Sequence, residues 1–262
     1  MKTPEIRAER PGALIIGASS GMGAALARTL AARGYTLALV ARNADALTQL
    51  CARINTAALA DRPVAYSYPH DVRDYAAAPA LFDQIRHDLG AAGSELRLVI
   101  YAAGVMPEPE QGVWSFDDER AMLETNFTGA IRWLAMAAAT FQRIGRGTII
   151  GISSVAGDRG RKGNSAYMAS KAALSTYLES LRYRLAGSGV RVVTAKPGYV
   201  ATPMTAGAKL PKPLVISADV AAARIADLAE RGPTVAYIPG YWRLIMAVIR
   251  AIPAALMPRL PI

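Results

Sequence analysis

The fold of this chain is decided by one stretch near its start, Ala13-Leu14-Ile15-Ile16-Gly17-Ala18-Ser19-Ser20-Gly21-Met22-Gly23. Its first four residues form a short apolar run, which is typical of a buried parallel strand. Three glycines follow, and glycine lets backbone N–H groups approach a pyrophosphate closely. The alanine-rich residues 24–32 predict a helix whose N-terminus attracts that anion. Together these features predict a dinucleotide-binding strand, loop and helix.

A second apolar run, Thr36 to Ala41, lies about twenty residues further on, as such a unit requires. In dinucleotide-binding folds the end of this second strand meets the adenosine ribose. Here the strand ends at Ala41 and Arg42 follows, so no carboxylate is present to bind a 2′-hydroxyl or to repel a 2′-phosphate. The sequence therefore predicts NADP(H) in preference to NAD(H).

Tyr167 and Lys171 stand four residues apart, and Ser154 ends an apolar run thirteen residues before the tyrosine. On a helix this spacing places a phenol and an ammonium on one face. A neighbouring cation favours phenolate, so we expect Lys171 to lower the pKa of Tyr167 and to make it a proton donor or acceptor near neutral pH. The Ser154 hydroxyl could hold a carbonyl oxygen beside that phenol.

The rest of the chain indicates an α/β protein. Apolar runs at 96–101, 148–152 and 190–195 alternate with alanine-rich helical stretches, the pattern of a parallel sheet covered on both faces. The 262 residues are 52% hydrophobic, and no long linker or repeat divides them. We expect one Rossmann-like, doubly wound domain over residues 1–262.

Composition argues against several other classes of protein. Cys51 is the only cysteine, and the N-terminus has no apolar signal region, so we expect a cytoplasmic protein without an internal disulfide. His70 and His87 are the only histidines and lie in no metal-ligand pattern, so neither a metal enzyme nor a Ser-His-Asp hydrolase is expected. We expect both histidines to be polar surface residues. A nucleic-acid partner is not expected either, because no recognised nucleic-acid module interrupts the fold.

The formal charge is +10, and twelve Lys or Arg lie between residues 143 and 212 against only two acidic residues. One interpretation is a solvated basic face. A more specific interpretation concerns Arg159, Arg161 and Lys162. They lie in the loop that joins the Ser154 strand to the Tyr167 helix, so we expect them to border the entrance of the substrate pocket. Arginine binds phosphate well in such positions, so we predict an anionic substrate with a phosphate near this loop.

Residues 241–262 form an apolar tail. Residues 241–250 predict an amphipathic helix that ends near Pro253. A membrane-spanning helix needs about 20 predominantly apolar residues, and Arg250, Pro253 and Pro258 interrupt this run. The tail could cap the substrate pocket, pack at a subunit interface or lie on a membrane surface at its inner face. A tail that covers the pocket and a tail that contacts a membrane would each suit an apolar substrate.

Together these motifs resemble the short-chain dehydrogenase/reductase family over residues 12 to 240. The resemblance implies a catalytic tetrad of Asn126, Ser154, Tyr167 and Lys171, in which Asn126 anchors a water that connects the lysine to solvent. It also implies a homodimer or homotetramer. With Arg42 added from the strand-end argument, the implied dinucleotide contacts are Gly17, Ser19, Ser20, Gly21, Met22, Gly23, Arg42, Asp71, Val72, Ala103, Gly104, Tyr167, Lys171, Pro197, Gly198, Val200 and Thr202.

One motif departs from the family pattern. After the fourth strand the family's Asn-Asn-Ala-Gly reads Tyr101-Ala102-Ala103-Gly104 here, which removes a side-chain amide that braces the central strands. The resemblance therefore still implies the cofactor contact at Gly104, but it no longer implies the bracing.

The function that the resemblance implies is reduction of a ketone by NADPH. Residues 156–164 and the closing residues resemble, more narrowly, reductases that act on a keto-sugar carried by a polyprenyl phosphate. The alternatives are a general reductase of small-molecule or acyl-chain carbonyls, and a sensor that binds dinucleotide without turnover. An intact proton-transfer set argues against the sensor.

Overall fold

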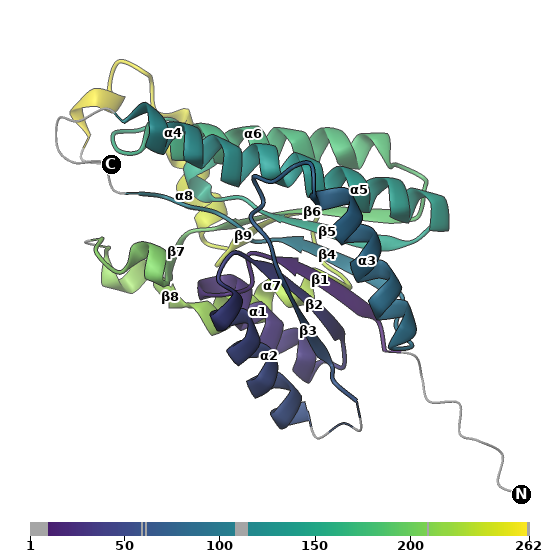
Figure 1. Cartoon of the computed structure of the whole chain (residues 1–262). Coiled ribbons are helices and arrows are strands. Elements are labelled where there is room, and N and C mark those ends of the chain that lie inside the picture. The colour runs from purple at the N-terminus through teal and green to yellow at the C-terminus, as the bar shows by residue number, and fades with distance from the viewer. Residues whose placement is uncertain (1–9, 59, 61, 108–114, 209, 261–262) are drawn as a thin grey trace, which may run out of the picture.

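The structure is a computed structural model that describes residues 10–58, 60, 62–107, 115–208 and 210–260. The ends of the predicted domain, residues 1–9 and 261–262, lie outside the described residues. Figure 1 shows a central sheet with helices above and below it, as the alternating apolar runs predict.

The central sheet has seven parallel strands in the order β3-β2-β1-β4-β5-β6-β9. The order reverses between β1 and β4, which is where doubly wound sheets bind their ligands. The strands are β1 (Gly12–Ile16), β2 (Thr36–Ala41), β3 (Ala65–Pro69), β4 (Leu96–Tyr101), β5 (Gly147–Ile152), β6 (Val190–Pro197) and β9 (Val235–Ile238). A second, two-stranded sheet pairs β7 (Tyr199–Ala201) with β8 (Val215–Ser217).

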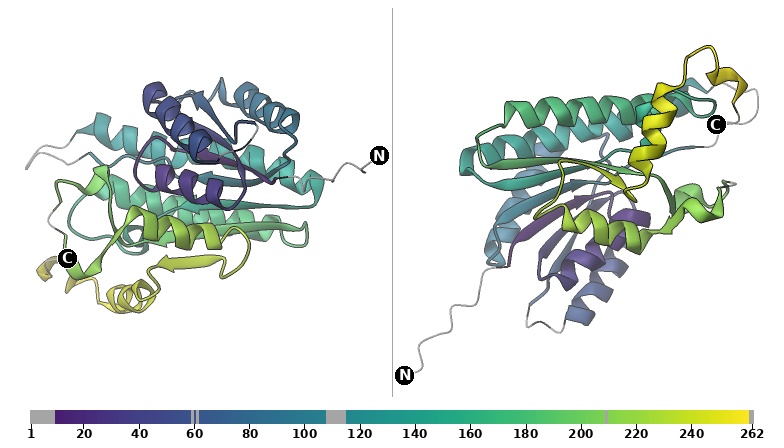
Figure 2. Two further views of the ribbon diagram at one scale, coloured as in Figure 1. Left: turned by 90° about the horizontal axis from the view of Figure 1, so that it is seen from below. Right: turned by 180° about the vertical axis from the view of Figure 1, so that it is seen from behind.

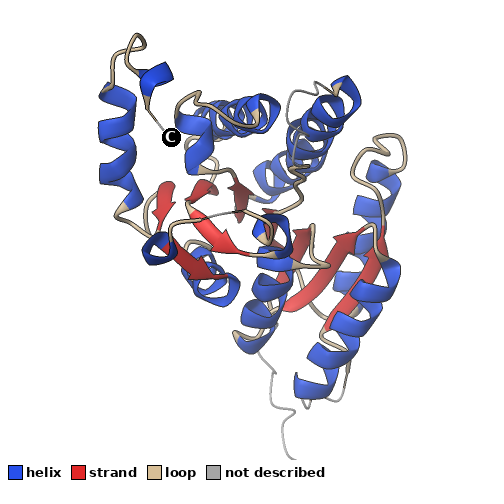
Figure 3. Ribbon diagram, turned by 90° about the vertical axis from the view of Figure 1, so that its left-hand side faces the viewer, coloured by secondary structure: helices blue, strands red, loops and turns tan. Residues whose placement is uncertain are grey.

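Helices cover both faces of the large sheet (Figures 2 and 3). One face carries α1 (Gly21–Ala32), α2 (Ala44–Ala58) and α7 (Ala218–Asp227), and the other carries α3 (Ala78–Ala91), α5 (Gly129–Ile144) and α6 (Ser165–Arg184). Two further helices are α4 (Phe116–Leu123), which packs against α6, and α8 (Trp242–Ala251), which packs against β9.

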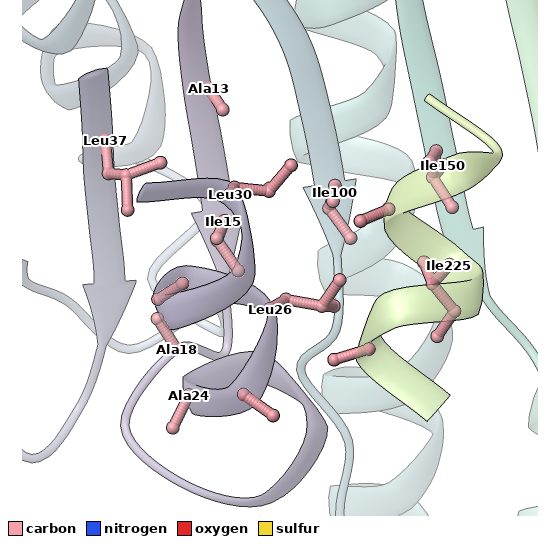
Figure 4. Packing of buried hydrophobic residues seen from close by; sticks show 14 of the residues in the cluster. Ala13, Ile15, Ala18, Ala24, Leu26, Leu30, Leu37, Ile100, Ile150 and Ile225 are labelled. Carbon is pink, nitrogen blue, oxygen red and sulfur yellow. The ribbon is translucent and has the colours of Figure 1, made fainter. Parts of the chain in front are cut away.

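The core forms two apolar layers because the central strands are buried on both sides. Every residue of β1 and β2 is buried. Figure 4 shows Ile15 and Ile100 of the sheet facing Leu26 of α1 and Ile225 of α7. Alternate residues of the same strands, such as Leu14 and Val99, pack against the opposite helices. The fold class predicted from the sequence is therefore confirmed.

The observed elements differ from the predicted ones mainly at their ends. The predicted strands at 36–41 and 96–101 match β2 and β4, whereas α1 begins at Gly21 instead of residue 24. The second and third glycines of the loop thus belong to the first turn of the helix. This brings the helix N-terminus closer to the expected pyrophosphate.

The tail forms the predicted amphipathic helix, α8, followed by a short turn at Met257–Arg259. Trp242 and Met246 point inward and are buried, whereas Leu244 and Val248 are 73% and 61% exposed. The Trp242 ring packs so closely on Gly198 that a Cβ there would overlap it. None of the helices in the described residues is long and apolar enough to cross a membrane.

Candidate dinucleotide-binding and catalytic site

A cavity of about 600 Å³ opens beside the carboxyl ends of β1, β2 and β4. Eleven of the sequence-predicted cofactor residues line it: Gly17, Ser19, Ser20, Gly21, Met22, Gly23, Arg42, Val72, Ala103, Gly104 and Thr202. The remaining predicted contacts, Asp71, Tyr167, Lys171, Pro197, Gly198 and Val200, do not line it. The cavity also includes residues that sequence reasoning missed, notably His70, Thr125 and Met204.

Two positions of the glycine loop accept no residue other than glycine. Gly17 has φ +90°, and a Cβ there would overlap the backbone of Ala103. A Cβ on Gly23 would overlap the Gly17 carbonyl. The backbone of the loop is therefore in direct contact with the backbone of α1 and with the residues that follow β4.

The N-terminus of α1 fits an anionic group. Ser20 is the N-cap residue, and its side chain makes no capping hydrogen bond. The first turn carries no acidic residue. Early N–H groups of a helix have no partner within the helix and carry its positive dipole end. These donors line the cavity where a dinucleotide's diphosphate would lie, so the residues present fit the cofactor.

The adenosine end of the cavity carries Arg42 directly after β2, as predicted, and its side chain is exposed. Asp71, the expected adenine contact, is instead held by Arg73, whose guanidinium lies 2.6 Å from the carboxylate. The hydrogen bond to Arg73 lowers the pKa of Asp71. Val72, the next residue, is buried and lines the cavity.

His70 corrects a prediction in part, because it is half-buried and not an exposed surface residue. Its ring packs edge-on against the Trp133 ring at 5.5 Å, and its buried Nε2 has no hydrogen-bond partner among the described residues. Burial lowers the pKa of His70. The position could have been suspected, because it directly follows β3 at the edge where ligands bind. His87 is exposed, as predicted. Within the described residues no group of His, Cys, Asp or Glu could hold a metal ion.

Tyr167 and Lys171 lie on the same side of α6, as their spacing predicts. The helix begins just before them, where Asn164 accepts a hydrogen bond from the Tyr167 backbone N–H at 3.0 Å. Lys171 is only 5% exposed, and its Nζ donates to the Ile152 carbonyl at the end of β5. That Nζ lies 5.8 Å from the centre of the Tyr167 ring.

Ser154 belongs to this group, because its side chain acts on the Tyr167 phenol and lowers the pKa of that phenol in part. The Ser154 oxygen also accepts from the Ala156 N–H at 3.0 Å, which fixes the turn that follows β5. The structure therefore brings the predicted serine, tyrosine and lysine together.

The predicted direction of the Tyr167 pKa is wrong for this state of the protein. Burial raises the pKa of Tyr167, and the neighbouring Ser154 side chain offsets that rise only in part. Burial also lowers the pKa of Lys171 to about 8. Both shifts have one cause, because a dry site disfavours the charged form of either group. The spacing of Tyr167 and Lys171 in the sequence shows that they are neighbours, but it does not show that both side chains are removed from water.

Asn126 lies in a π-helical turn, η1 (Glu124–Thr128), between α4 and α5, and is fully buried. Its amide accepts from the Val105 N–H at 2.8 Å and donates to the Val105 carbonyl at 3.0 Å. It also donates to the Ser170 hydroxyl on α6 at 3.1 Å. Asn126 thus joins the loop after β4 to the helix of Tyr167. Its predicted contact with a water stays a prediction.

The segment after β6 runs from Pro197 to Thr202. Within this segment Val200 is buried, and Gly198 contacts Trp242 of the tail. Thr202 lines the dinucleotide cavity, and a Cβ on Gly104 would lie 3.8 Å from Met204. Met204 and Lys171 thus both approach Gly104, and no sequence pattern indicated this position of Met204.

The basic loop borders a different cavity, of about 750 Å³. Arg159, Arg161 and Lys162 line it together with the tail residues Met257 and Pro258. Its α6 residues recur at positions 165, 168, 169 and 172, which places them on a face other than that of Tyr167 and Lys171. The structure thus does not bring the basic loop and the catalytic group into one cavity, and their shared substrate stays a prediction.

Comparison with known proteins identifies a family for this arrangement. The family model described as short chain dehydrogenase matches residues 12–212. An uncharacterized oxidoreductase of Myxococcus xanthus is 35% identical over 232 residues, covering 88% of either chain. A ketoacyl reductase of Nostoc sp. is 31% identical over 76% of this chain and 67% of its own.

Solved structures have the same fold. A 3-oxoacyl-[acyl-carrier protein] reductase from Brucella melitensis superimposes with a TM-score of 0.74 at 25% identity, over 91% of this chain and 95% of its own. A variant actinorhodin polyketide ketoreductase with NADPH gives a TM-score of 0.77 at 23% identity, over 89% and 97%. Because the family model matches well over half of the chain, the chain belongs to the short-chain dehydrogenase/reductase family of NAD(P)-dependent oxidoreductases.

Proposed function

We propose that this protein reduces a ketone to an alcohol with NADPH and that Asn126, Ser154, Tyr167 and Lys171 are its catalytic residues. The observation that carries the proposal is the buried Lys171 ammonium, which lies 5.8 Å from the Tyr167 ring and is held by the Ile152 carbonyl, with Ser154 acting on the same phenol. A protein that only bound a dinucleotide would have no need of this proton-transfer group.

Each residue has a role that follows from its position. Bound NADPH supplies the hydride equivalent that reduces the ketone carbon. The Ser154 hydroxyl acts on the Tyr167 phenol, so a substrate oxygen placed between the two would receive two donors, and the Tyr167 phenol delivers the proton to that oxygen. Lys171 brings a positive charge within 5.8 Å of the phenol ring and favours the phenolate left behind.

The residues around the cavity would hold the dinucleotide along its length. The N–H groups at the start of α1 bind the diphosphate, and Lys171 binds the nicotinamide ribose. Arg42 meets the 2′-phosphate at the end of β2, which is the basis for preferring NADPH to NADH. The contacts expected from Pro197, Gly198 and Val200 are part of the same proposal.

Two observations bear on the substrate. The named relatives include a ketoacyl reductase and a 3-oxoacyl-[acyl-carrier protein] reductase, which supports a ketone on an acyl chain as the general form. The second cavity combines three basic side chains with Met168 and Met257, and Arg161 has a buried Nε without a partner among the described residues. Basic and apolar groups together suit an apolar chain that ends in phosphate. We therefore keep a keto-sugar on a polyprenyl phosphate as the specific form.

The tail participates in the same proposal. Trp242 and Met246 anchor α8 against Val155, close to the catalytic serine. Arg159 of the basic loop donates to the Ile252 carbonyl at 3.1 Å, so a hydrogen bond joins the loop to the tail. The outward-facing Leu244 and Val248 are the surface on which a contact with a membrane or with a second copy would depend.

Replacement of Tyr167 with Phe tests the chemistry. We expect NADPH-dependent reduction of a panel of ketones to fall by about 10²–10⁴-fold, because the proton donor is lost. The affinity for NADPH, measured by the change in nucleotide fluorescence, should remain. Tyr177→Phe, on the same helix and outside the described cavities, is the matched control and should keep full activity. Equal rates in Tyr167→Phe and the parent would contradict the assigned role.

Replacement of Arg42 with Ala tests the cofactor preference. We expect the KM for NADPH to rise by about 10–100-fold, since a charge-assisted hydrogen bond contributes about 1.5–3 kcal/mol. The KM for NADH should change less than twofold. Steady-state kinetics with both nucleotides measures the two values. A parallel rise for NADH would show that Arg42 does not meet the 2′-phosphate.

A triple variant of Arg159, Arg161 and Lys162 to Gln tests the anionic substrate. Farnesyl phosphate should inhibit ketone reduction by the parent, and its Ki should rise about tenfold in the variant as the phosphate contacts are lost. Inhibition by farnesol should stay the same in both. A control triple of the exposed Arg143, Arg184 and Arg231 to Gln removes the same charge elsewhere and should keep the parental Ki. An unchanged Ki in the loop variant would remove the phosphate from the proposal.

A further inference from the structure

We propose that Tyr101 is a positioning residue that braces the π-helical turn η1 and so holds Asn126 in the catalytic group. The inference rests on the proposed function for the role of Asn126, but the bracing itself is a property of the fold. It assigns a purpose to the residue at which this chain departs from the family pattern.

Tyr101 is the last residue of β4 and is completely buried. Its hydroxyl donates a hydrogen bond of 2.5 Å to the Thr125 carbonyl, in the turn that carries Asn126. A buried phenol needs such a partner, because an unpaired polar group in a dry site is destabilising. Whether the central strands lose the bracing by an amide stays a prediction, but Tyr101 supports a different element at this position. The brace is a phenol that reaches across to a helix.

The π-helical turn depends on support from outside. Its bonds run from residue i to i+5, a wide and rare geometry that occurs mostly as single turns at functional sites. The Gly129 N–H closes it by donating to the Glu124 carbonyl. The turn interrupts an otherwise continuous helix from α4 to α5. The hydrogen bond from the Tyr101 hydroxyl holds this turn in place against β4.

Gly129 provides the space that Tyr101 needs. A Cβ at Gly129 would lie 2.8 Å from the Tyr101 hydroxyl oxygen and 3.1 Å from the Val72 carbonyl. Real Cβ atoms are essentially never as close as 2.8 Å to another heavy atom, so any larger residue would push the phenol away from Thr125. The tyrosine and the glycine therefore act as a matched pair.

The brace reaches the catalytic residues through Asn126. The Asn126 amide holds both backbone groups of Val105 and donates to the Ser170 hydroxyl. Ser170 in turn donates to the Tyr167 carbonyl at 2.7 Å. A Cβ on Gly104, next to Val105, would lie 3.4 Å from the Asn126 oxygen and 3.5 Å from Lys171 Nζ. A shift of the turn would thus disturb the cavity wall and the catalytic helix at once.

Four variants of the full chain test this inference: Tyr101→Phe, Gly129→Ala, the double variant, and Tyr75→Phe. Tyr75 is the matched control, because its hydroxyl faces the same turn but bonds the neighbouring Glu124 carbonyl more weakly, at 3.5 Å. The first readout is hydrogen exchange of the Val105 backbone amide, measured by NMR without cofactor. The second is kcat with the KM for NADPH.

Tyr101→Phe should raise the exchange rate of the Val105 amide about tenfold and lower kcat about tenfold, the ratio that corresponds to 1.4 kcal/mol. The KM for NADPH should stay within about twofold, because the diphosphate is held by α1. Amides in the centre of β1 and β6 should be unaffected, as should every readout in Tyr75→Phe. Gly129→Ala should have the larger effect on Val105. The double variant should recover part of that effect, since loss of the hydroxyl makes room for the methyl group.

Parental exchange at Val105 in Tyr101→Phe would overturn the inference. So would a rise shared equally by all sheet amides, which would indicate a general loss of stability. Activity retained in Tyr167→Phe beside the expected exchange pattern would refute the proposed function while supporting the brace, so the two failures are distinguishable.

Discussion

The interaction on which this site depends is the burial of the Lys171 ammonium against the end of β5. Its Nζ donates to the Ile152 carbonyl at 2.9 Å, at the carboxyl edge of the sheet. Moving a cation out of water is costly, and the shift of its pKa to about 8 reflects that cost. The sheet, the cap at Asn164 and the face of α6 together hold the ammonium beside Tyr167.

The fold and most of the site could be predicted because their signals are local. The order of strand, glycine loop and helix can be recognised from residues that are close in the sequence, and so can the four-residue spacing of Tyr167 and Lys171. What could not be predicted depends on tertiary contacts. The pKa of Tyr167 is raised by burial, Met204 reaches the site across the sheet edge, and the basic loop lies on another face of α6. Desolvation and side-chain direction are not properties of spacing.

The tail and the loop after Ser154 form one unit around a buried ion pair. Asp158 accepts from Lys196 Nζ at 2.6 Å and from the Tyr237 hydroxyl at 2.6 Å. Breaking such a pair by removing one partner leaves an uncompensated buried charge and is strongly destabilising. The loop is therefore held by β6 and β9, and α8 packs over it. This explains how a partly exposed, strongly basic segment can be part of a well-defined cavity.

The most direct test of the account is the pKa of Lys171 in the protein without nucleotide. NMR titration of 13Cε-labelled lysine, with Lys171→Met to assign the signal, should show one lysine that loses its charge as the pH rises through about 8. The unfolded chain would bind more protons between this pH and 10.5, so the free energy of unfolding should rise with pH across that window. A Lys171 pKa at its ordinary value of 10.5 would show that the ammonium is hydrated and would contradict the catalytic site described above.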